Sequence, residues 1–549
     1  MVVHRIDMEQ VVDARLLELA GDTVDAQAHA LVHVDGPHPA PDIEDMTGRR
    51  HRGQRAQRWM LFDNRPRGRG RADEFFRHGC DLRTFGRTAD NGGLPVATTL
   101  GHSGSSLTQI SVAGRLPQHA ARWPLLRRQA GGRGSVRRYL YDRPSQARTA
   151  EPLERGMRLN PLAIEAIYSP IASAHALLGQ RAGRLDLLDL AQAVPQYPPA
   201  PEVVEHIAAT ARDPHGAAYV ATAGLPALRE AFAAELTADY RGLVRPEHVI
   251  ITAGCNQAFC LVASALAAPG DEIVLSLPYY FNHDMWLRMT GITPVYLDPG
   301  PDLIPRPEAA EALITPRTRA ILVVTPGNPS GVTVPPERIA ALAEVAARHD
   351  IALILDETYR SFRDTTEPPH PLFADPEWTR TVVGLHSFSK DLAIPGYRVG
   401  AVVASTELGA EVAKLLDCVA ICAPRIGQEA ALAGLRSAGP WRRARARDIA
   451  VRRHRFTEVM AGRPGGYEML STGGFFGWIR HPFAGRSTED VVRELILEYD
   501  TLVIPGTAFM PDDRGTIRVS FSNTDPDSIT EFAGRLAASG RQPAAALRP

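Results

Sequence analysis

From about residue 200 the sequence alternates short apolar runs with amphipathic stretches of helical spacing. Strands that are apolar on both faces must be covered on both faces, which is typical of parallel sheets with helical crossovers. The pattern therefore predicts an α/β fold with a mainly parallel sheet between helices. The apolar runs are VIITA (249–253), EIVLS (272–276), AILVV (320–324), IALILD (351–356), TVVGLHS (381–387) and RVGAVVAS (398–405).

The tail from about residue 440 has a different pattern. An Arg-rich helical stretch is followed by GGFFGWI, a second helical stretch, TLVIPG, TIRVSFS and a last helix. Strands and helices in this order predict a smaller α+β unit. The chain has 549 residues, 44% of them hydrophobic, which is enough for a sizeable core. At roughly 100–200 residues per domain, this length suggests about three domains.

The composition excludes several classes of protein. No apolar run reaches the ~18 residues that a membrane-spanning helix needs, and Asp7 and Glu9 interrupt the stretch where a signal peptide would be apolar. The five cysteines are odd in number and show no CxxC or Cys/His ligand spacing, which argues against a disulfide framework and a zinc site. We therefore expect a cytoplasmic protein with no metal site.

The segment 1–156 differs from the rest in charge. It holds 24 arginines, no lysine and 18 acidic residues, a balance of +6, whereas the remainder has a balance of −7. Its Arg-rich tracts could contact nucleic acid, but the segment shows no winged helix or other DNA-reading module. We expect a disordered extension or an over-extended start, and a chain that begins at Met157 is expected to keep full activity.

Polar residues stand where the expected strands end. Asp356 closes one run, Asn328 and Lys390 follow two others, and the Gly-Cys-Asn run 254–256 follows VIITA. Each has an ordinary explanation alone, as a cap, a turn or a solvated loop residue. In an open α/β sheet, however, ligands bind at the carboxyl ends of the strands. A carboxylate, an amide, a lysine and a glycine-opened helix at one edge together indicate a binding site.

The residue types at this edge suit one cofactor. A helix that opens at Gly254 presents free N–H groups to a phosphate, and Ser387, Ser389 and Arg398 can add hydroxyls and a guanidinium. A lysine can form a Schiff base with an aldehyde, and a carboxylate can keep a pyridinium nitrogen protonated. Phosphate, aldehyde and pyridine together describe pyridoxal 5′-phosphate (PLP).

The amine of that Schiff base has few candidates. Only two of the 61 basic residues are lysines, Lys390 and Lys414. Lys414 lies in LGAEVAKLLDC, an amphipathic stretch with no strand end beside it, and is expected to be a surface residue. Lys390 is therefore the candidate nucleophile.

These motifs resemble those of the class I/II aminotransferases of PLP fold type I. SFSKDLAIPGYRVG has that family's lysine and phosphate-binding arginine, and TPGNPSG, DETY and TIRVSF have its Asn-Pro, Asp-x-x-Tyr and carboxylate-binding arginine. AYVATAGLPALREA and PYYFNH also match. The resemblance runs from about Arg158 to the last helix. It implies an N-terminal arm with part of the small domain at 157–205, a large PLP-binding domain at 206–438 and the C-terminal small domain at 439–549.

The resemblance also implies catalytic roles. Lys390 would form the internal aldimine with PLP and then carry the proton between the substrate Cα and the cofactor. Asp356 would pair with the pyridine nitrogen, with His283 behind it or simply packed in the core. Asn328 and Tyr359 would hydrogen-bond the ring oxygen O3′.

Other implied roles concern the surroundings of the cofactor and the substrate. Tyr280 would stack on the ring. Tyr219 would reach the phosphate of a neighbouring subunit, which implies a homodimer with shared sites. Arg518 would bind the substrate α-carboxylate as a fork-to-fork pair. The remaining phosphate site would comprise Gly254, Cys255, Asn256, Ser387, Ser389 and Arg398.

Two departures from the family bear on the substrate. Ala193 stands where the family usually has glycine, and Met510 stands where it often has glycine. Both PYYFNHDMWLRMTGI and ICAPRIGQEAAL look most like the branch that takes aromatic and methionine-like amino acids. Dicarboxylate-specific relatives have an extra arginine shortly before the second segment, where LLDCVAIC has none, although Arg425 is a candidate substitute. Candidates for apolar lining, each equally explained as core, are Tyr168, Val194, Tyr197 and Phe475.

The expected function is a PLP-dependent transfer of an amino group from an aromatic or neutral L-amino acid to a 2-oxo acid. Asn328 and Val194 would contact the substrate together with Arg518. Three alternatives stay open: an aspartate-type transaminase, a carbon–sulfur lyase with the same cofactor residues and, in another class, a transcription regulator with an aminotransferase-like domain.

Overall fold

The computed structural model of the protein describes residues 157–541, together with the backbone of short strands between residues 3 and 113. The chain divides into two compact units, Met1–Thr149 and Ala150–Pro549. The predictions of a disordered extension or an over-extended start concern residues 1–156, of which the structure describes only these strands. The strands are β1 (Val3–His4), β2 (Leu31–His33), β3 (Ile43–Glu44), β4 (Arg50–His51), β5 (Arg58–Leu61), β6 (Leu82–Gly86), β7 (Ala97–Ser103) and β8 (Ser106–Ala113). They pair antiparallel, in the orders β1-β6-β5-β2-β8-β7 and β3-β4.

The second unit contains a seven-stranded sheet of order β10-β16-β15-β14-β13-β11-β12. Every strand runs parallel to the others except β16, which is antiparallel to both of its neighbours. The predicted mainly parallel sheet is therefore confirmed. Its strands are β10 (Val249–Thr252), β11 (Glu272–Ser276), β12 (Thr293–Leu297), β13 (Thr318–Val324), β14 (Ala352–Asp356), β15 (Val382–Ser387) and β16 (Gly400–Val403).

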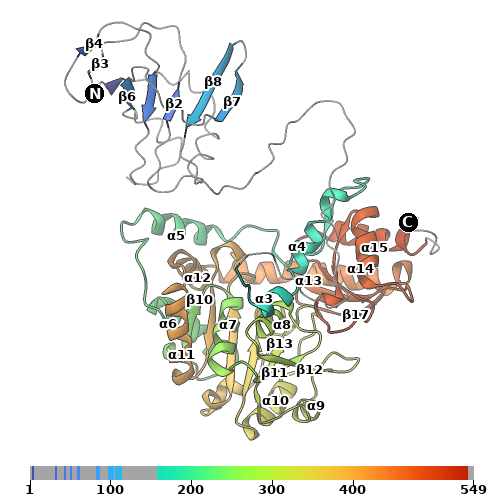
Figure 1. The fold of residues 1–549 in the computed structure, drawn as a ribbon. Coiled ribbons are helices and arrows are strands. Elements are labelled where there is room, and N and C mark those ends of the chain that lie inside the picture. Colours follow the sequence, from blue (N-terminus) through green and yellow to red (C-terminus); the bar gives the residue numbers. More distant parts are fainter. Residues whose placement is uncertain are drawn as a thin grey trace. The chain divides into compact units, whose positions relative to one another are not determined.

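Helices cover both faces of this sheet because its side chains alternate between two apolar cores (Figure 1). In β13, Ala320 and Leu322 face the core that α7 (Cys255–Leu266), α8 (Phe281–Met289) and α11 (Thr406–Ala420) complete. Ile321 and Val323 face the opposite core. That core is completed by α5 (Pro201–Arg212), α6 (Pro226–Tyr240), α9 (Pro307–Glu311), α10 (Pro336–Arg348) and α12 (Arg425–Ser437). Truncating one buried strand residue such as Leu322 to alanine would cost about 2–5 kcal/mol.

A smaller α+β part follows, as the tail pattern predicts. Its four-stranded antiparallel sheet has the order β17-β18-β21-β20. Near the start of the second unit, β9 (Leu188–Asp189) pairs in parallel with β19 of this part. The remaining elements are α3 (Pro161–Glu165), α4 (Pro170–His175), α13 (Gly439–Ala461), β17 (Glu468–Gly473), β18 (Phe476–Arg480), α14 (Thr488–Glu498), β19 (Thr501–Leu502), β20 (Ile504–Pro505), β21 (Thr516–Ser520) and α15 (Pro526–Ser539).

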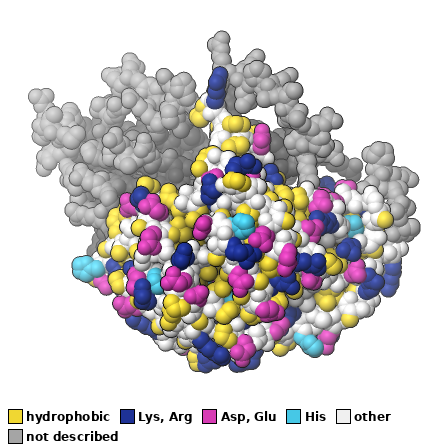
Figure 2. All heavy atoms as spheres, turned by 90° about the horizontal axis from the view of Figure 1, so that it is seen from below, with side chains coloured by type: hydrophobic (Ala, Val, Ile, Leu, Met, Phe, Trp, Pro, Cys, Tyr) yellow, Lys and Arg dark blue, Asp and Glu magenta, His cyan; other side chains and the backbone are white. Residues whose placement is uncertain are grey.

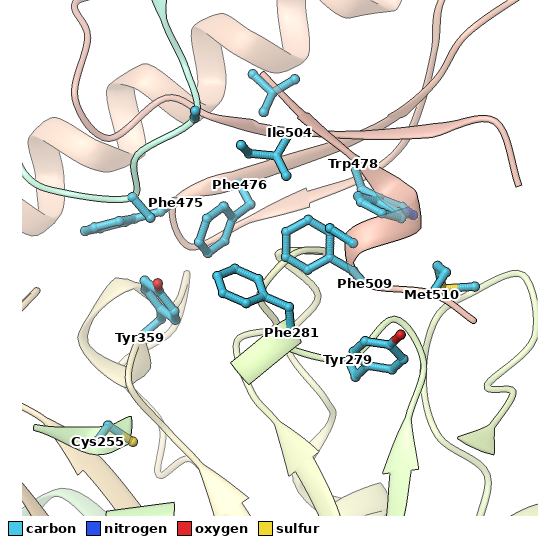
Figure 3. Close-up of a cluster of buried hydrophobic side chains, with 14 of the residues drawn as sticks. Cys255, Tyr279, Phe281, Tyr359, Phe475, Phe476, Trp478, Ile504, Phe509 and Met510 are labelled. Carbon is cyan, nitrogen blue, oxygen red and sulfur yellow. The ribbon is translucent and has the colours of Figure 1, made fainter. Parts of the chain in front are cut away.

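An aromatic cluster joins the two sheets (Figure 3). Phe281 of α8 packs on Phe509, with ring centroids 5.7 Å apart, and Tyr359 packs on Phe475 and Phe476 at 5.2 and 5.1 Å. Such pairs stabilise by about 0.5–1.5 kcal/mol beyond the area they bury. The cluster therefore fixes the carboxyl end of β14 against the small sheet.

The exposed surface of the second unit carries both signs of charge. On the face in Figure 2, arginines and acidic side chains are interspersed. Within the described part of the chain, no helix is both long and apolar enough to span a membrane.

Candidate active site

Asp356 lies at the carboxyl end of β14 and is buried. Its Oδ1 accepts a hydrogen bond from the backbone N–H of Thr358 at 3.0 Å, and its Oδ2 lies 3.4 Å from Nε2 of His283. Although burial opposes ionisation, His283 and Thr358 hold the pKa of Asp356 below its usual value. The carboxylate therefore stays ionised and can hold a proton on a partner nitrogen.

Lys390 follows β15 by three residues, at the same edge of the sheet. Its Nζ donates a hydrogen bond to the carbonyl of Ala193 at 2.5 Å. Burial, together with the charges of Arg518 and Arg398, lowers the pKa of Lys390 to about 8. A neutral amine, which is the nucleophilic form, is therefore accessible near neutral pH.

A cradle for an anion forms where α7 begins. Gly254 caps the helix with φ of 87°, and a Cβ at this position would lie 2.3 Å from Nη2 of Arg398. Gly400, which pairs with Ser387 in the sheet, lies against the peptide that joins Gly254 to Cys255. The first N–H groups of a helix have no partner within the helix. The start of α7, the guanidinium of Arg398 and the hydroxyl of Ser387 therefore offer donors to a phosphate.

Arg518 comes from β21 of the small sheet, and its side chain is 1% exposed. Its Nη1 donates to Oδ1 of Asn328 at 3.1 Å, and its Nη2 donates to the carbonyl of Ala191. The rings of Phe476 and Phe509 lie 5.3 and 5.0 Å from the guanidinium carbon. Among the described residues no carboxylate lies within 4 Å of it, and burial lowers its pKa to about 10.

Two tyrosines that the sequence predicts for the site lie beside these groups. Tyr359 is buried at the end of β14, and burial raises its pKa. Tyr280 precedes α8 and accepts a hydrogen bond from Nδ2 of Asn282 at 3.0 Å, and its ring meets that of His283 edge-on at 5.1 Å. The structure therefore brings both rings next to the Asp356–His283 pair.

Cys255 contributes a side chain as well as an N–H group. Its thiol is buried, and burial followed by the charge of Asp356 raises its pKa well above the usual value. The thiol therefore stays protonated, so Cys255 is no nucleophile in this site.

Four other residues named in the sequence analysis differ in their exposure and contacts. The side chain of Tyr219 is 76% exposed. Tyr197 packs on Trp441 and Arg445 of α13, with the ring of Tyr197 5.5 Å from that of Trp441. Phe475 is buried behind Tyr359, and Lys414 is 69% exposed and paired with Glu411 at 2.7 Å.

Residues 186–536 match the family described as aminotransferase class I and II. The chain belongs to this family. Aromatic aminotransferase ISS1 of Arabidopsis thaliana is 31% identical over 365 residues, which cover 64% of this aminotransferase and 88% of that relative. Aspartate/prephenate aminotransferase of Thermus thermophilus is 30% identical over 68% of this chain and 95% of its own length.

Solved structures agree with this assignment. A mutant aspartate aminotransferase of Thermus thermophilus superposes with a TM-score of 0.64 at 27% identity, over 70% of this aminotransferase and all of that chain. An aminotransferase from Mycobacterium tuberculosis gives a TM-score of 0.63 at 25% identity, over 70% of this chain and 99% of that one. The fold-type I prediction is therefore confirmed.

The enzyme is a PLP-dependent aminotransferase, as the resemblance implied. The residues present fit the cofactor. A Cβ on Gly254 would fill the cradle, the charges of Arg518 and Arg398 both act on Lys390, and among the described residues no carboxylate lies within 4 Å of any of these three cations. A phosphate and a substrate carboxylate would balance this excess of positive charge.

The sequence did not reveal several neighbours of the aminotransferase site. The carbonyls of Ala191 and Ala193, which accept from Arg518 and Lys390, are backbone groups and leave no trace in residue type. Phe476 lies over the guanidinium of Arg518, whereas its neighbour Phe475, the candidate for apolar lining, packs on Tyr359. Because neighbours in a strand face opposite sides, the register of GGFFGWI against TIRVSF could have revealed this.

Proposed function

We propose that this aminotransferase transfers the amino group of an aromatic or other neutral L-amino acid to a 2-oxo acid. When bound, PLP supplies an aldehyde for the amino group and a pyridinium ring that accepts the electron pair released at the substrate Cα. Lys390 attaches the cofactor and then moves the proton at the substrate Cα. Asp356 keeps the pyridine nitrogen protonated, and its low pKa supports that role.

The cofactor is held by the groups around these two residues. Tyr280 would cover the ring, and Tyr359 and Asn328 would donate hydrogen bonds to its phenolic oxygen. The phosphate would be held by the cradle made by Gly254, Cys255, Asn256, Ser387, Ser389 and Arg398. We also propose a cytoplasmic homodimer, in which the exposed Tyr219 reaches the phosphate of the other subunit.

The observation that carries the proposal is Arg518. A buried guanidinium with no carboxylate within 4 Å among the described residues is costly, because burial removes its hydration without a paired opposite charge. The α-carboxylate of an amino acid would supply that charge and the second arm of a fork-to-fork pair. The sequence analysis names Asn328 and Val194 as further contacts of the substrate. Oδ1 of Asn328 accepts a hydrogen bond from Arg518.

The contacts of Arg425 favour a substrate whose side chain is neutral. Its Nη1 donates to the carbonyl of His215 at 2.7 Å, and its Nε lies 3.5 Å from Glu429. Glu429 also contacts Nε2 of His206 at 2.9 Å. An arginine that is held by a carboxylate of its own helix and by a backbone carbonyl of another segment is a poor receptor for a second substrate carboxylate. The name of the Arabidopsis relative supports the same substrate class.

The substrate class can be tested by visible absorption of the purified enzyme. Phenylalanine and methionine should bleach the band of the bound cofactor, and aspartate at the same concentration should not. Bleaching by aspartate alone would contradict the neutral-substrate proposal and favour the aspartate-type reading that the Thermus relative suggests. Release of ammonia without a 2-oxo acid would identify a carbon–sulfur lyase instead.

The two lysines provide a matched test of the chemistry. Lys390→Ala should lower kcat by at least about 1,000-fold, because the nucleophile and the proton carrier are both removed. Lys414→Ala should change kcat less than twofold, because this side chain is exposed and pairs with the exposed Glu411. Borohydride reduction followed by peptide mapping should place the cofactor on Lys390, and its recovery on Lys414 would refute the assignment.

A further inference from the structure

Four charged side chains form an alternating series directly behind the candidate site. Arg442 of α13 donates through Nε to Asp391 at 2.7 Å and through Nη1 and Nη2 to Glu235 of α6 at 2.6 and 3.0 Å. Arg360 donates to the same Glu235. We call Asp391, Arg442, Glu235 and Arg360 the ion chain. Arg360 also donates to Asp239 at 2.5 Å, which closes its outer end.

The ion chain is largely shielded from solvent. Its side chains are between 10% and 16% exposed. Although burial opposes ionisation, Arg360 and Arg442 hold the pKa of Glu235 at about 2. Each charge is therefore matched by an opposite neighbour, and removing a central arginine would leave two carboxylates facing each other in a poorly solvated place.

The ends of the ion chain touch the candidate site through the backbone. Asp391 is the residue after Lys390, and Arg360 is the residue after Tyr359. The two strands that precede these turns, β14 and β15, end four residues earlier and are neighbours in the sheet. Arg442 of α13 therefore holds Asp391, in the turn after β15. Glu235 of α6 binds both Arg442 and Arg360, and Arg360 lies in the turn after β14.

We propose that the ion chain is a positioning device that holds the amine of Lys390 and the hydroxyl of Tyr359 at a fixed separation, with Arg442 as its central residue. The inference rests on the proposed roles of Lys390 and Tyr359 toward the cofactor. None of the four charged groups is a catalytic residue: they act through the backbone of their neighbours. A small misplacement of a reacting group costs up to about 100-fold in rate, so the ion chain affects turnover more than substrate affinity.

The same helix supplies a matched control. Arg453 lies three turns further along α13 and also pairs with a residue outside the helix, Asp364. The side chains of Arg442 and Arg453 are each 15% exposed, but Asp364 is 70% exposed. Arg453→Met therefore removes an arginine of equal burial from the same helix without touching the ion chain.

The experiment compares full-length Arg442→Met and Arg453→Met with bound cofactor. For Arg442→Met we expect kcat to fall by about 10- to 100-fold with KM changed less than threefold. We also expect the pH midpoint of the cofactor's absorbance change to move by at least half a unit, a readout independent of turnover. For Arg453→Met both quantities should equal those of the unmodified enzyme.

A second set of variants keeps the test valid if Arg442→Met does not fold. Arg442→Lys keeps the charge but loses the planar fork, so it should move the absorbance midpoint in the same direction by a smaller amount. Adding Asp391→Asn to Arg442→Lys should cause no further shift, because both changes break one link. Fully additive shifts, or an absorbance midpoint unchanged in both Arg442 variants, would overturn the inference.

The outcome is distinguishable from a failure of the proposed function. If Lys390→Ala still binds cofactor covalently, the lysine assignment is wrong whatever Arg442 does. If Lys390→Ala loses the covalent cofactor while Arg442→Met matches Arg453→Met, only the positioning inference is wrong.

Discussion

Asp356 and Glu357 are adjacent residues at the end of β14, and they point to opposite faces of the sheet. Both carboxylates are buried, and each lies beside a histidine: Asp356 is 3.4 Å from His283, and Glu357 is 3.6 Å from His370. Because successive side chains of a strand alternate, one step along the backbone separates two carboxylate–histidine pairs of nearly the same geometry.

The surroundings of the two pairs differ. Asp356 lies on the face with Tyr359 and with Cys255, the first residue of the helix at the anion cradle. The pair of Glu357 and His370 lies in an aromatic core, where the ring of His370 is 4.7 Å from Tyr240 and 5.0 Å from Phe373. A buried carboxylate–histidine pair therefore does not mark a catalytic site. Access to a ligand makes the difference.

The largest effect that would test this comparison is on turnover. Asp356→Asn should lower kcat by about 100-fold or more, because a neutral amide cannot stabilise a protonated ring nitrogen. Glu357→Gln, one residue away, should leave kcat within about threefold. Steady-state rates at saturating cofactor measure both, and equal losses would show that the two faces are not functionally distinct.

A smaller effect concerns stability, and here the substitution of Glu357 is expected to cost more than that of Asp356. Although burial opposes ionisation, His370, His386 and Tyr240 hold the pKa of Glu357 at about 2. Glu357→Gln should therefore lower the free energy of unfolding near pH 7 by about 3 kcal/mol, because a neutral amide replaces a buried carboxylate whose ionised form these neighbours stabilise. Asp356→Asn should cost less than half of that. Thermal or urea unfolding of the cofactor-free variants, where no ligand adds stability, compares them.

The smallest effect is a change of slope with pH. Burial lowers the pKa of His386 to about 4, whereas an unfolded histidine titrates near 6.5. Between these values the unfolded chain binds more protons than the folded one, so stability falls as the pH falls. His386→Phe should remove up to about 1 kcal/mol per pH unit of this loss between pH 6.5 and 4.5. Unfolding midpoints that vary equally with pH in both proteins would contradict the expectation.

Sequence periodicity was sufficient for most of the large sheet. Six of its seven strands are buried apolar runs, while β12 (TPVYL) is a partly exposed edge strand with no such run. The side chains that the chemistry requires could also be predicted from the sequence, because a near-unique lysine and an aspartate at a strand end are unusual. Their backbone partners were not, and neither was the pairing of Asp391 with Arg442, which are 51 residues apart and resemble ordinary surface charges until α13 is placed.

The pairing of β9 with β19 and the bond from Arg518 to Ala191 have a consequence for biosynthesis. The two bonded residues are 327 positions apart, so Ala191 leaves the ribosome long before its partner exists. At about 5–20 residues per second, the delay is roughly 16 to 65 seconds. The large sheet can form during that interval, but the substrate side of the site is completed only after nearly the whole chain has been translated.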